Sequence, residues 1–315
     1  MPTVTPIRSF SSLLSLMKES GERCVAVVCP YDEATREAVC RAAAEGIARV
    51  VLVGEEARIG RPDGRLACSG RLTLVPAATP GEAARAAVRM VRRGGADVGM
   101  KGLLNTDVLL HAILDKEAGL LPPGRVLTHI MAAELPGSGR LLFGSDVAVI
   151  PHPTLDQRRA ILSYGTAVCR AFGVVRPRVA LLHYSEKTDE RVPLTLDCRE
   201  LVRRAGAGEW GDAIVDGPLD LRCALDAESE RIKGIESPLE GRADFLLFPD
   251  LEAGNLFYKT LPLLCGARVA GMLAGAQCPV VLSSRSDQAG DKFLSLAFAL
   301  YAASHGVAVS SPTDS

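Results

Sequence analysis

The stretch PVVLSSRSDQAGDK, residues 279–292, contains the pattern that decides the fold. It begins with a short apolar run at 280–282, which is typical of the end of a buried strand. Apolar residues then recur at helical spacing, at Phe293, Leu296, Ala297 and Leu300. Open α/β sheets bind ligands in loops that connect the carboxyl end of a strand to the amino end of a helix. The stretch therefore predicts a strand, a ligand-binding loop and a helix.

The loop also contains side chains suited to an anion. Backbone N–H groups and the positive end of the helix dipole would face a ligand there. Ser284 adds a hydroxyl group, Arg285 a fixed cation with a planar fork, and Asp291 a carboxylate in the first helical turns. Ser286 and Asp287 are candidate helix caps. The plainer alternative is that the serines only cap the helix and that Asp291 only complements its dipole.

Composition narrows the class of protein. A chain of 315 residues exceeds the usual size of a single core, so two domains are expected. Hydrophobic residues make up 48% and aromatic residues only 4%, which favours layered helices and parallel strands over an antiparallel sandwich. With 36 basic and 37 acidic residues, the net charge of −1 gives no reason to expect nucleic-acid or membrane-surface binding.

The cysteines and the N-terminal residues indicate the cellular compartment of the protein. The nine cysteines show no CxxC pairing, which indicates reduced thiols in a cytoplasmic protein. The five histidines are scattered, so structural zinc is not expected. The first 20 residues are typical of an amphipathic helix and not of a signal peptide. The sequence has no apolar run of 18 residues, so no membrane span is expected.

Strands and helices are expected to alternate along the whole chain. Strands are expected at 24–29, 50–53, 72–75, 97–100, 126–131, 140–143, 147–150, 179–182, 212–216, 243–248, 269–273 and 280–282. Helices are expected after Asp32 and at 80–93, 107–116, 154–172 and 254–264. The Pro-Pro-Gly sequence at 122–124 is expected to mark a crossing between domains.

Polar groups follow several of these strands. Lys101 and Gly102 lie between a strand and a helix, where lysine can bind phosphate and glycine allows a close approach, and Asn105 or Thr106 can cap the helix. His183 to Ser185, Asp216 to Pro218, and Pro249-Asp250 leading to Gly254 and Asn255 follow other strands. Each is more often a turn than a site, but together they suggest loops gathered at one edge of a sheet.

Four motifs resemble the phosphate acetyl/butyryltransferase family, in order and over nearly the whole chain from about 24 to 303. They are KGLLNT (101–106), VDGPLDLRCALD (215–226), KGIESPLEGRADFLLFPDLEAGNLFYK (233–259) and LSSRSDQAGDK (282–292). The butyryl branch is the more similar, because it also has Lys-Gly at the position of 101–102 and a motif like KGIESP at the position of 233–238.

The resemblance implies reversible transfer of a short acyl group, acetyl to butyryl, between coenzyme A and inorganic phosphate. The implied fold is two α/β domains with a cleft between them, similar to isocitrate and isopropylmalate dehydrogenases. We expect residues 1–124 with 275–315 to form one domain and 125–274 the other. The family needs no metal and no cofactor beyond coenzyme A as substrate, and its members are homo-oligomers built on a dimer.

The resemblance also implies roles for individual residues. Catalysis falls to Ser284, Arg285 and Asp291, which match the acetyl branch. The expected substrate-binding residues are Lys101, Gly102, Thr106, His111, Gly254, Asn255 and Asp287. His111 departs from the family, because the acetyl branch has arginine there and the butyryl branch often lysine. A second departure, PHPTLDQR at 151–158, has no interpretation.

The chemistry of these side chains agrees with that role. A thiol with a pKa of about 8.5 is mostly protonated at neutral pH, so a base assists its attack on an acyl phosphate. Asp291 is the expected base, Arg285 would hold the phosphate, and Ser284 would donate to the developing charge. Asp287, four residues earlier, could reach the same thiol, but we expect it to cap the helix. The attack is direct, in a ternary complex, and a cysteine nucleophile ranks lower.

Two other functions remain open at this point. One is a dehydrogenase of the same fold, which would need a cluster of metal-binding carboxylates that the sequence does not show. The other is a non-catalytic domain that senses acyl-CoA, against which the complete set of Ser284, Arg285 and Asp291 argues.

Overall fold

The computed structural model describes residues 6–19, 21–60 and 69–307. These residues cluster into two compact units. The split unit, built from both ends of the sequence, contains the described residues of Ser9–Leu127 and Val269–Val309. The middle unit contains Thr128–Arg268, together with residues 6–8, because the N–H of Ile7 donates to the carbonyl of Phe172 at 3.0 Å. The chain passes from the split unit to the middle unit after Leu127 and returns to the split unit after Arg268.

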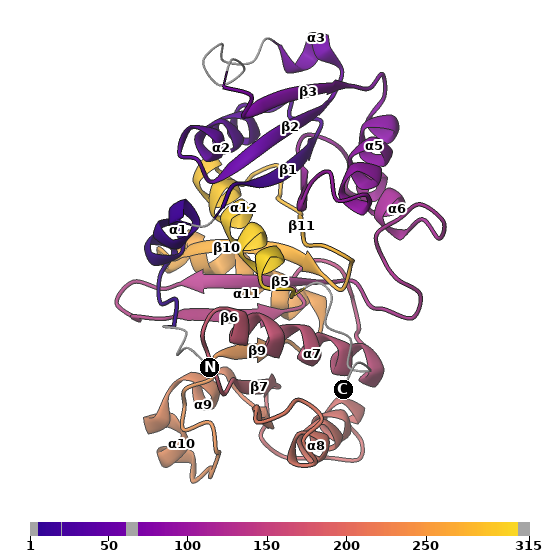
Figure 1. Ribbon diagram of the computed structural model, residues 1–315. Helices are drawn as coiled ribbons and strands as arrows, with labels where there is room; N and C mark the ends of the chain where they lie inside the picture. The colour runs from indigo at the N-terminus through magenta and orange to yellow at the C-terminus, as the bar shows by residue number, and fades with distance from the viewer. Residues whose placement is uncertain (1–5, 20, 61–68, 308–315) are drawn as a thin grey trace. The chain divides into compact units, whose positions relative to one another are not determined.

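The strands of the split unit follow the order β3-β2-β1-β4-β11-β10; Figure 1 labels all of them except β4. Neighbours from β3 to β11 are parallel, and β10 is antiparallel to β11. The strand order reverses between β1 and β4, and ligands bind at such a switch point in doubly wound sheets. The bounds are β1 Arg23–Val28, β2 Ala48–Gly54, β3 Leu72–Pro76, β4 Val98–Lys101, β10 Arg268–Ala274 and β11 Val280–Val281.

Helices pack on this sheet, and α12 is the most buried of those described in the unit. Figure 1 shows α12, in yellow, beside α2 and α1. Eleven of its residues are buried, so it is apolar around most of its circumference, and the guanidinium of Arg41 in α2 lies 4.0 Å from the ring centre of Phe293. The bounds are α1 Phe10–Glu19, α2 Glu33–Ala44, α3 Glu56–Ile59, α5 Pro80–Arg92, α6 Thr106–Leu114 and α12 Ala289–Ser304.

The predicted cap at Asp32 is confirmed. Its carboxylate accepts hydrogen bonds from the backbone N–H and the hydroxyl group of Thr35, at 2.8 and 2.7 Å. Helix α5 begins in the same way, since the hydroxyl oxygen of Thr79 accepts the N–H of Glu82 at 3.2 Å and Pro80 occupies the first helical position.

The strands of the middle unit follow the order β5-β6-β9-β7-β8. Only the β5–β6 pair is antiparallel among them. The strand bounds are β5 Thr128–Glu134, β6 Leu141–Ser145, β7 Arg178–Leu182, β8 Ile214–Leu219 and β9 Phe245–Leu247. The helix bounds are α7 Leu155–Ala171, α8 Pro193–Gly206, α9 Leu221–Leu225, α10 Ala227–Lys233 and α11 Leu251–Leu264.

The strand predicted at 147–150 is wrong. The buried carboxylate of Asp146 accepts the backbone N–H groups of Ala148, Val149 and Ile150 at 2.7, 2.9 and 3.2 Å, so these groups are not available to a sheet. The hydroxyl of Thr128 donates to the same carboxylate at 2.8 Å. These apolar residues therefore surround the buried carboxyl group of Asp146 and donate backbone hydrogen bonds to it.

One smaller expectation is also wrong. Asp216 to Pro218 lie inside β8, which continues to Leu219, and not in a loop after it; the β7–β8 register shifts between Ala180 and Leu182. In the described parts of the chain, no helix combines the length and the apolar character needed to cross a membrane.

Gly102 is required where the loop after β4 crosses the loop after β1. Its N–H donates to the carbonyl of Val28 at 2.8 Å, and a Cβ atom there would lie 2.3 Å from the carbonyl oxygen of Cys29. That oxygen belongs to the backbone, so the two loops would have to separate.

We therefore expect Gly102→Ala to lower the free energy of unfolding by about 1–3 kcal/mol, as overpacking does. Gly206→Ala is the matched control, because nothing lies within 4 Å of a Cβ at that helical position, and alanine there should be neutral or stabilising by up to about 1 kcal/mol. Urea-induced unfolding of both variants checks this, and equal midpoints would contradict it.

Candidate active site

Three loops of the split unit meet at the carboxyl ends of β1, β4 and β11. Val28 pairs with Lys101, and Met100 with Val281, so the three strands end side by side. The loops that follow carry Asp32, residues 102–105 and residues 283–288. This is the switch point of the sheet, and five of the residues predicted for the site lie there: Lys101, Gly102, Ser284, Arg285 and Asp287.

Two lysine ammonium groups are buried under the loop that contains Ser284. Lys101 and Lys292 are each only 2% exposed. The Nζ of Lys101 donates to the carbonyl of Ser283 at 3.2 Å. The Nζ of Lys292 donates to the carbonyl of Ser284 at 3.0 Å and to the hydroxyl of Ser283 at 3.2 Å. The two lysines therefore hold the backbone of this loop from the protein side.

The exposed side of the same loop carries Ser284 and Arg285. The N–H of Ser284 donates to the carboxylate of Asp287 at 2.7 Å, and its hydroxyl lies 3.0 Å from that of Ser286. The guanidinium of Arg285 donates to the side-chain carbonyl of Asn105, in the loop after β4. Both Ser284 and Arg285 are exposed, so their polar groups are accessible to a ligand.

The cap expected at Ser286 or Asp287 is wrong, because α12 begins one residue later. Its N-cap is Gln288, which makes no side-chain capping bond. The carboxylate of Asp287 is instead used by the N–H of Ser284, in the turn before the helix. Asp287 thus shapes the loop, and Asp291 lies in the first turn of α12.

Asp291 has the properties expected of a base. Burial and then the negative charge of Asp287 raise the pKa of its carboxyl group, against a hydrogen bond from the backbone of Gln288 that lowers it. A raised pKa makes the carboxylate a stronger proton acceptor. An aspartate is a weak base at its ordinary pKa, and the partial burial that strengthens it is present at this position.

Positive charge is concentrated around the loop. Burial, and then the charges of Lys292 and Arg285, lower the pKa of the Lys101 ammonium, and Asp32 and Asp287 act in the opposite direction. Burial raises the pKa of Asp32, but the hydrogen bonds from Thr35 and the positive charge of Lys292 together outweigh burial, so the pKa is lowered. Lys292 therefore lies close enough to Asp32 to interact with it electrostatically. Like charges held together in this way favour an anionic ligand.

Two predicted residues lie on α6, the helix that follows Asn105. Thr106 is the first residue of the helix and His111 is in its last turn, and both are exposed. At 100° a residue, they project about 140° apart around the helix axis. Neither makes a side-chain hydrogen bond or an ion pair within residues 6–19, 21–60 and 69–307, so their substrate-binding roles stay predictions.

Gly254 and Asn255 belong to the middle unit and have structural roles there. A Cβ at Gly254 would lie 2.0 Å from the carbonyl oxygen of Asp146, and the side-chain amide of Asn255 donates to the carbonyl of Val147 at 2.8 Å. These contacts dock the first turn of α11 on the loop after β6. A role in binding substrate also stays a prediction.

Sequence reasoning missed Lys292, Ser283, Asn105 and Asp32 as parts of this cluster. Asp32 was recognised only as a cap, and Lys292 follows Asp291 directly but would ordinarily be assigned to solvent. The available signal for Lys292 was the apolar stretch FLSLAFAL (293–300) directly after it, because a helix that is apolar around its circumference leaves little exposed surface.

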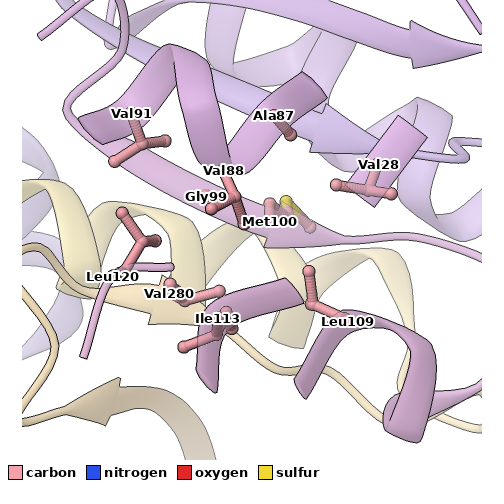
Figure 2. Close-up of a pocket in the computed structure, with 10 residues that line it drawn as sticks. All are labelled: Val28, Ala87, Val88, Val91, Gly99, Met100, Leu109, Ile113, Leu120 and Val280. Carbon is pink, nitrogen blue, oxygen red and sulfur yellow. The ribbon is translucent and has the colours of Figure 1, made fainter. Parts of the chain in front are cut away.

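The apolar gap in the split unit is not a substrate pocket. Figure 2 shows side chains of α5, α6, β4 and β11 converging on it, among them Val88, Met100 and Ile113. Its volume of about 10 Å³ is room for one water molecule at most. The gap therefore belongs to the core.

Within the described residues, the ligand-type groups of Glu186, Asp220 and Cys223 come within 4.8 Å of one another. The ammonium of Lys233 donates to both carboxylates, at 2.6 Å each. An internal cation is thus already paired with both carboxylates of this group.

Comparison with known proteins identifies the family. The model of the family described as "Phosphate acetyl/butaryl transferase" matches residues 77–300. The chain is 35% identical over 294 residues to a phosphate butyryltransferase of Clostridium acetobutylicum, covering 93% of this chain and 97% of that protein. It is also 35% identical over 297 residues to a phosphate acetyltransferase of Rhizobium meliloti, covering 93% of each.

Solved structures agree on the fold. A branched-chain phosphotransacylase from Enterococcus faecalis V583 matches with a TM-score of 0.80 and 28% identity, over 89% of this chain and 99% of that chain. A putative 4-hydroxythreonine-4-phosphate dehydrogenase from Salmonella typhimurium matches with a TM-score of 0.54 at 13% identity, over 90% of this chain and 99% of that one, which confirms the expected dehydrogenase-like α/β fold. The chain belongs to the phosphate acetyl/butyryl transferase family of acyltransferases.

Proposed function

We propose that the protein transfers a short acyl group between coenzyme A and phosphate by direct attack, with Ser284, Arg285 and Asp291 as the catalytic residues. The observation that carries this proposal is the loop at 283–288. It presents a hydroxyl and a guanidinium outward, has two buried ammonium groups beneath it, and lies beside a carboxylate of raised pKa.

The phosphate part of the substrate fits the positive charge of this loop. Arg285 can donate two parallel hydrogen bonds to phosphate oxygens, and its bond to Asn105 fixes the direction from which it does so. Lys101 and Lys292 donate to backbone groups and contribute their charge from within the protein. Their field would be strongest for the doubly charged phosphate that leaves as the acyl group is transferred.

The thiol of coenzyme A loses its proton to the carboxylate of Asp291. As the sulfur–carbon bond forms, the bond between the acyl carbon and the phosphate oxygen breaks, and phosphate leaves with the electron pair. Ser284 donates its hydroxyl hydrogen to the carbonyl oxygen that gains charge in the transition state, a contribution of roughly 3 kcal/mol for one such donor. The reverse direction uses protonated Asp291 as the acid.

The two alternatives have less support. A domain that only senses acyl-CoA would have no need of an aspartate with a raised pKa beside the loop. A dehydrogenase would need carboxylates free to bind a metal, and in the described part of the chain Lys233 is already paired with both Glu186 and Asp220.

The decisive assay measures release of coenzyme A from acetyl-, propionyl-, butyryl- and branched acyl-CoA at increasing phosphate concentrations. We expect release to depend on phosphate with saturation, in the absence of added metal. Equal rates with and without phosphate would indicate a thioesterase, and no release at all would indicate a sensor.

We expect Asp291→Asn to lower kcat by about 10²–10⁴, because the base is lost. The fold should not be weakened. A carboxyl whose pKa is raised on folding is more favourable protonated, so a neutral amide there should maintain or raise stability at neutral pH. Steady-state kinetics together with urea unfolding check both parts, and loss of activity with a matching loss of stability would contradict a role in proton transfer.

Asp287→Asn is the matched variant, four residues away. Asparagine can still accept the N–H of Ser284, so the loop should remain folded with a cost of about 1 kcal/mol or less. Removing the negative charge of Asp287 should lower the pKa of Asp291 and move the acidic limb of the kcat profile to lower pH. If Asp287→Asn abolishes turnover while Asp291→Asn stays active, the two roles are reversed.

Phosphate should stabilise the protein through Lys292. For a ligand at a hundredfold excess over its Kd, stabilisation is about 2.7 kcal/mol. We expect Lys292→Met, which keeps the length of the side chain, to lose most of this effect, while Lys116→Met, at an exposed position in the same unit, retains it. Thermal unfolding with and without phosphate is the measurement, and an undiminished phosphate effect in Lys292→Met would place the anion elsewhere.

His111 tests whether α6 contributes to phosphate binding. Arginine keeps its charge at every pH of the assay, whereas histidine loses its charge near neutrality. If His111 faces phosphate, His111→Arg should lower the KM for phosphate and flatten its rise between pH 6 and 8. His152→Arg, also exposed but in the middle unit, is the control. A KM that does not differ between His111→Arg and the unaltered protein would leave His111 a surface residue.

A further inference from the structure

A cavity lies between the last turn of α5 and the segment that follows α6, both in the split unit. Figure 1 shows these two helices side by side. The cavity has a volume of about 290 Å³, and its lining residues are Arg89, Arg92, Arg93, Glu117 and Ala118. Three guanidinium groups on the wall of one cavity are suited to an anion.

This cavity is separate from the candidate active site. Helix α5 ends at Arg92 and leads to the beginning of β4 at Val98, whereas the candidate active site follows the other end of that strand, after Lys101. Helix α6 starts beside the candidate active site and ends at Leu114, just before the segment that lines the cavity. The two places therefore lie at opposite edges of one sheet, and no step of the proposed reaction uses the cavity.

The wall opposite α5 is a turn fixed by hydrogen bonds. The carboxylate of Asp115 accepts the backbone N–H groups of Ala118 and Glu117, at 2.7 and 3.0 Å. These two bonds, and then the charge of Arg92, lower the pKa of Asp115, so its carboxyl group stays ionised. The guanidinium of Arg92 donates to the carbonyl of Glu117, which ties the helix to the turn. The cavity therefore has a defined shape without a ligand.

The charges around the cavity are not balanced. Arg89 and Arg93 are exposed, and neither forms an ion pair within residues 6–19, 21–60 and 69–307. One cation in the last turn of a helix would complement the helix dipole, but three arginines within five positions exceed that need. Two carboxylates oppose them, Glu117 in the lining and Asp115 in the turn. A net positive charge is left for a ligand.

We propose that this cavity binds the phosphate chain of an oligophosphate, either inorganic or attached to a nucleoside. Each guanidinium can donate two parallel hydrogen bonds to one phosphate group, so three arginines match linked phosphates better than a single phosphate. The volume is close to the lower limit of ligand pockets, about 300 Å³, which admits the chain and leaves a nucleoside in solvent. None of the five lining residues is aromatic, so the site has no preference for a base.

A nucleic acid suits this cavity less well. Surfaces that bind single strands combine a basic track with aromatic side chains on which the bases stack. Here the turn at 115–118 closes one side, and Arg85 alone continues the basic surface along α5. The net charge of the chain, −1, gives no further attraction for a long polyanion. The inference concerns a second binding site and does not rest on the proposed function.

Isothermal titration calorimetry of the full chain with inorganic tripolyphosphate tests the site. We expect Arg89→Gln/Arg93→Gln to raise the Kd by about tenfold or more, because hydrogen bonds between charged groups are lost. Glutamine resembles arginine in helix propensity, so urea unfolding should be unaltered. Arg92 stays in place because it holds the turn. Arg85→Gln, one turn earlier and outside the lining, is the control and should change the Kd by less than about threefold.

A variant that gains affinity provides a second test, because misfolding cannot produce a gain. Glu117→Gln removes the negative side chain from the lining and keeps the backbone bonds of the turn. It should lower the Kd for tripolyphosphate by about two- to fivefold. ATP and GTP should bind alike, and both should compete with tripolyphosphate. A Glu117→Gln variant that binds more weakly than the unaltered protein would overturn the proposal.

Arg285→Gln distinguishes this site from the candidate active site. The binding that Arg89→Gln/Arg93→Gln loses should remain in Arg285→Gln. Loss of tripolyphosphate binding in Arg285→Gln alone would place the oligophosphate in the candidate active site and overturn the proposal. Three further results would also overturn it. They are an equal Kd for the double variant and the unaltered protein, no binding of tripolyphosphate at millimolar concentration, and tighter binding of a short single-stranded oligonucleotide that the double variant loses.

Discussion

The structure of the site depends on one constraint, that the buried ammonium group of Lys292 must find hydrogen-bond acceptors. A buried charge without partners is among the most unfavourable arrangements in a protein. Here the partners are the carbonyl of Ser284 and the hydroxyl of Ser283. These hydrogen bonds connect the first turn of α12 to the loop after β11. The charge of Lys292 also helps to lower the pKa of Asp32, in the loop after β1. The place of Ser284 and Arg285 follows from this bond.

The same constraint explains why the site suits its proposed chemistry. Lys101 and Lys292 are both buried, and each lies beneath the same stretch of backbone. Their mutual repulsion is relieved only in part by Asp32 and Asp287. In the proposed reaction an anion would complete the charge balance, so binding energy would be available for phosphate at this loop. Active sites commonly give up some stability for such an arrangement.

Much of the fold was predictable because periodicity reports burial directly. The apolar runs alone were sufficient to predict the strands β1, β2 and β4, and the cap at Asp32 followed from local chemistry.

The errors arose where a distant polar group competes for the backbone. Residues 147–150 are as apolar as a strand, but Asp146 takes their N–H groups. Asp287 could not cap α12 because Ser284 uses its carboxylate. Lys292 was missed because burial of a lysine depends on acceptors that sequence does not place.

The position of β11 has a consequence for how the protein is made. Lys101 at the end of β4 and Ser283 after β11 are hydrogen-bonded across 182 residues of sequence. At 5–20 residues a second, a ribosome needs about 10 to 35 s to synthesise that interval. Throughout this time one edge of β4 has no neighbouring strand, while the whole middle unit is being made. Unpaired strand edges bind other chains readily, so this edge of β4 is open to aggregation during synthesis of the middle unit.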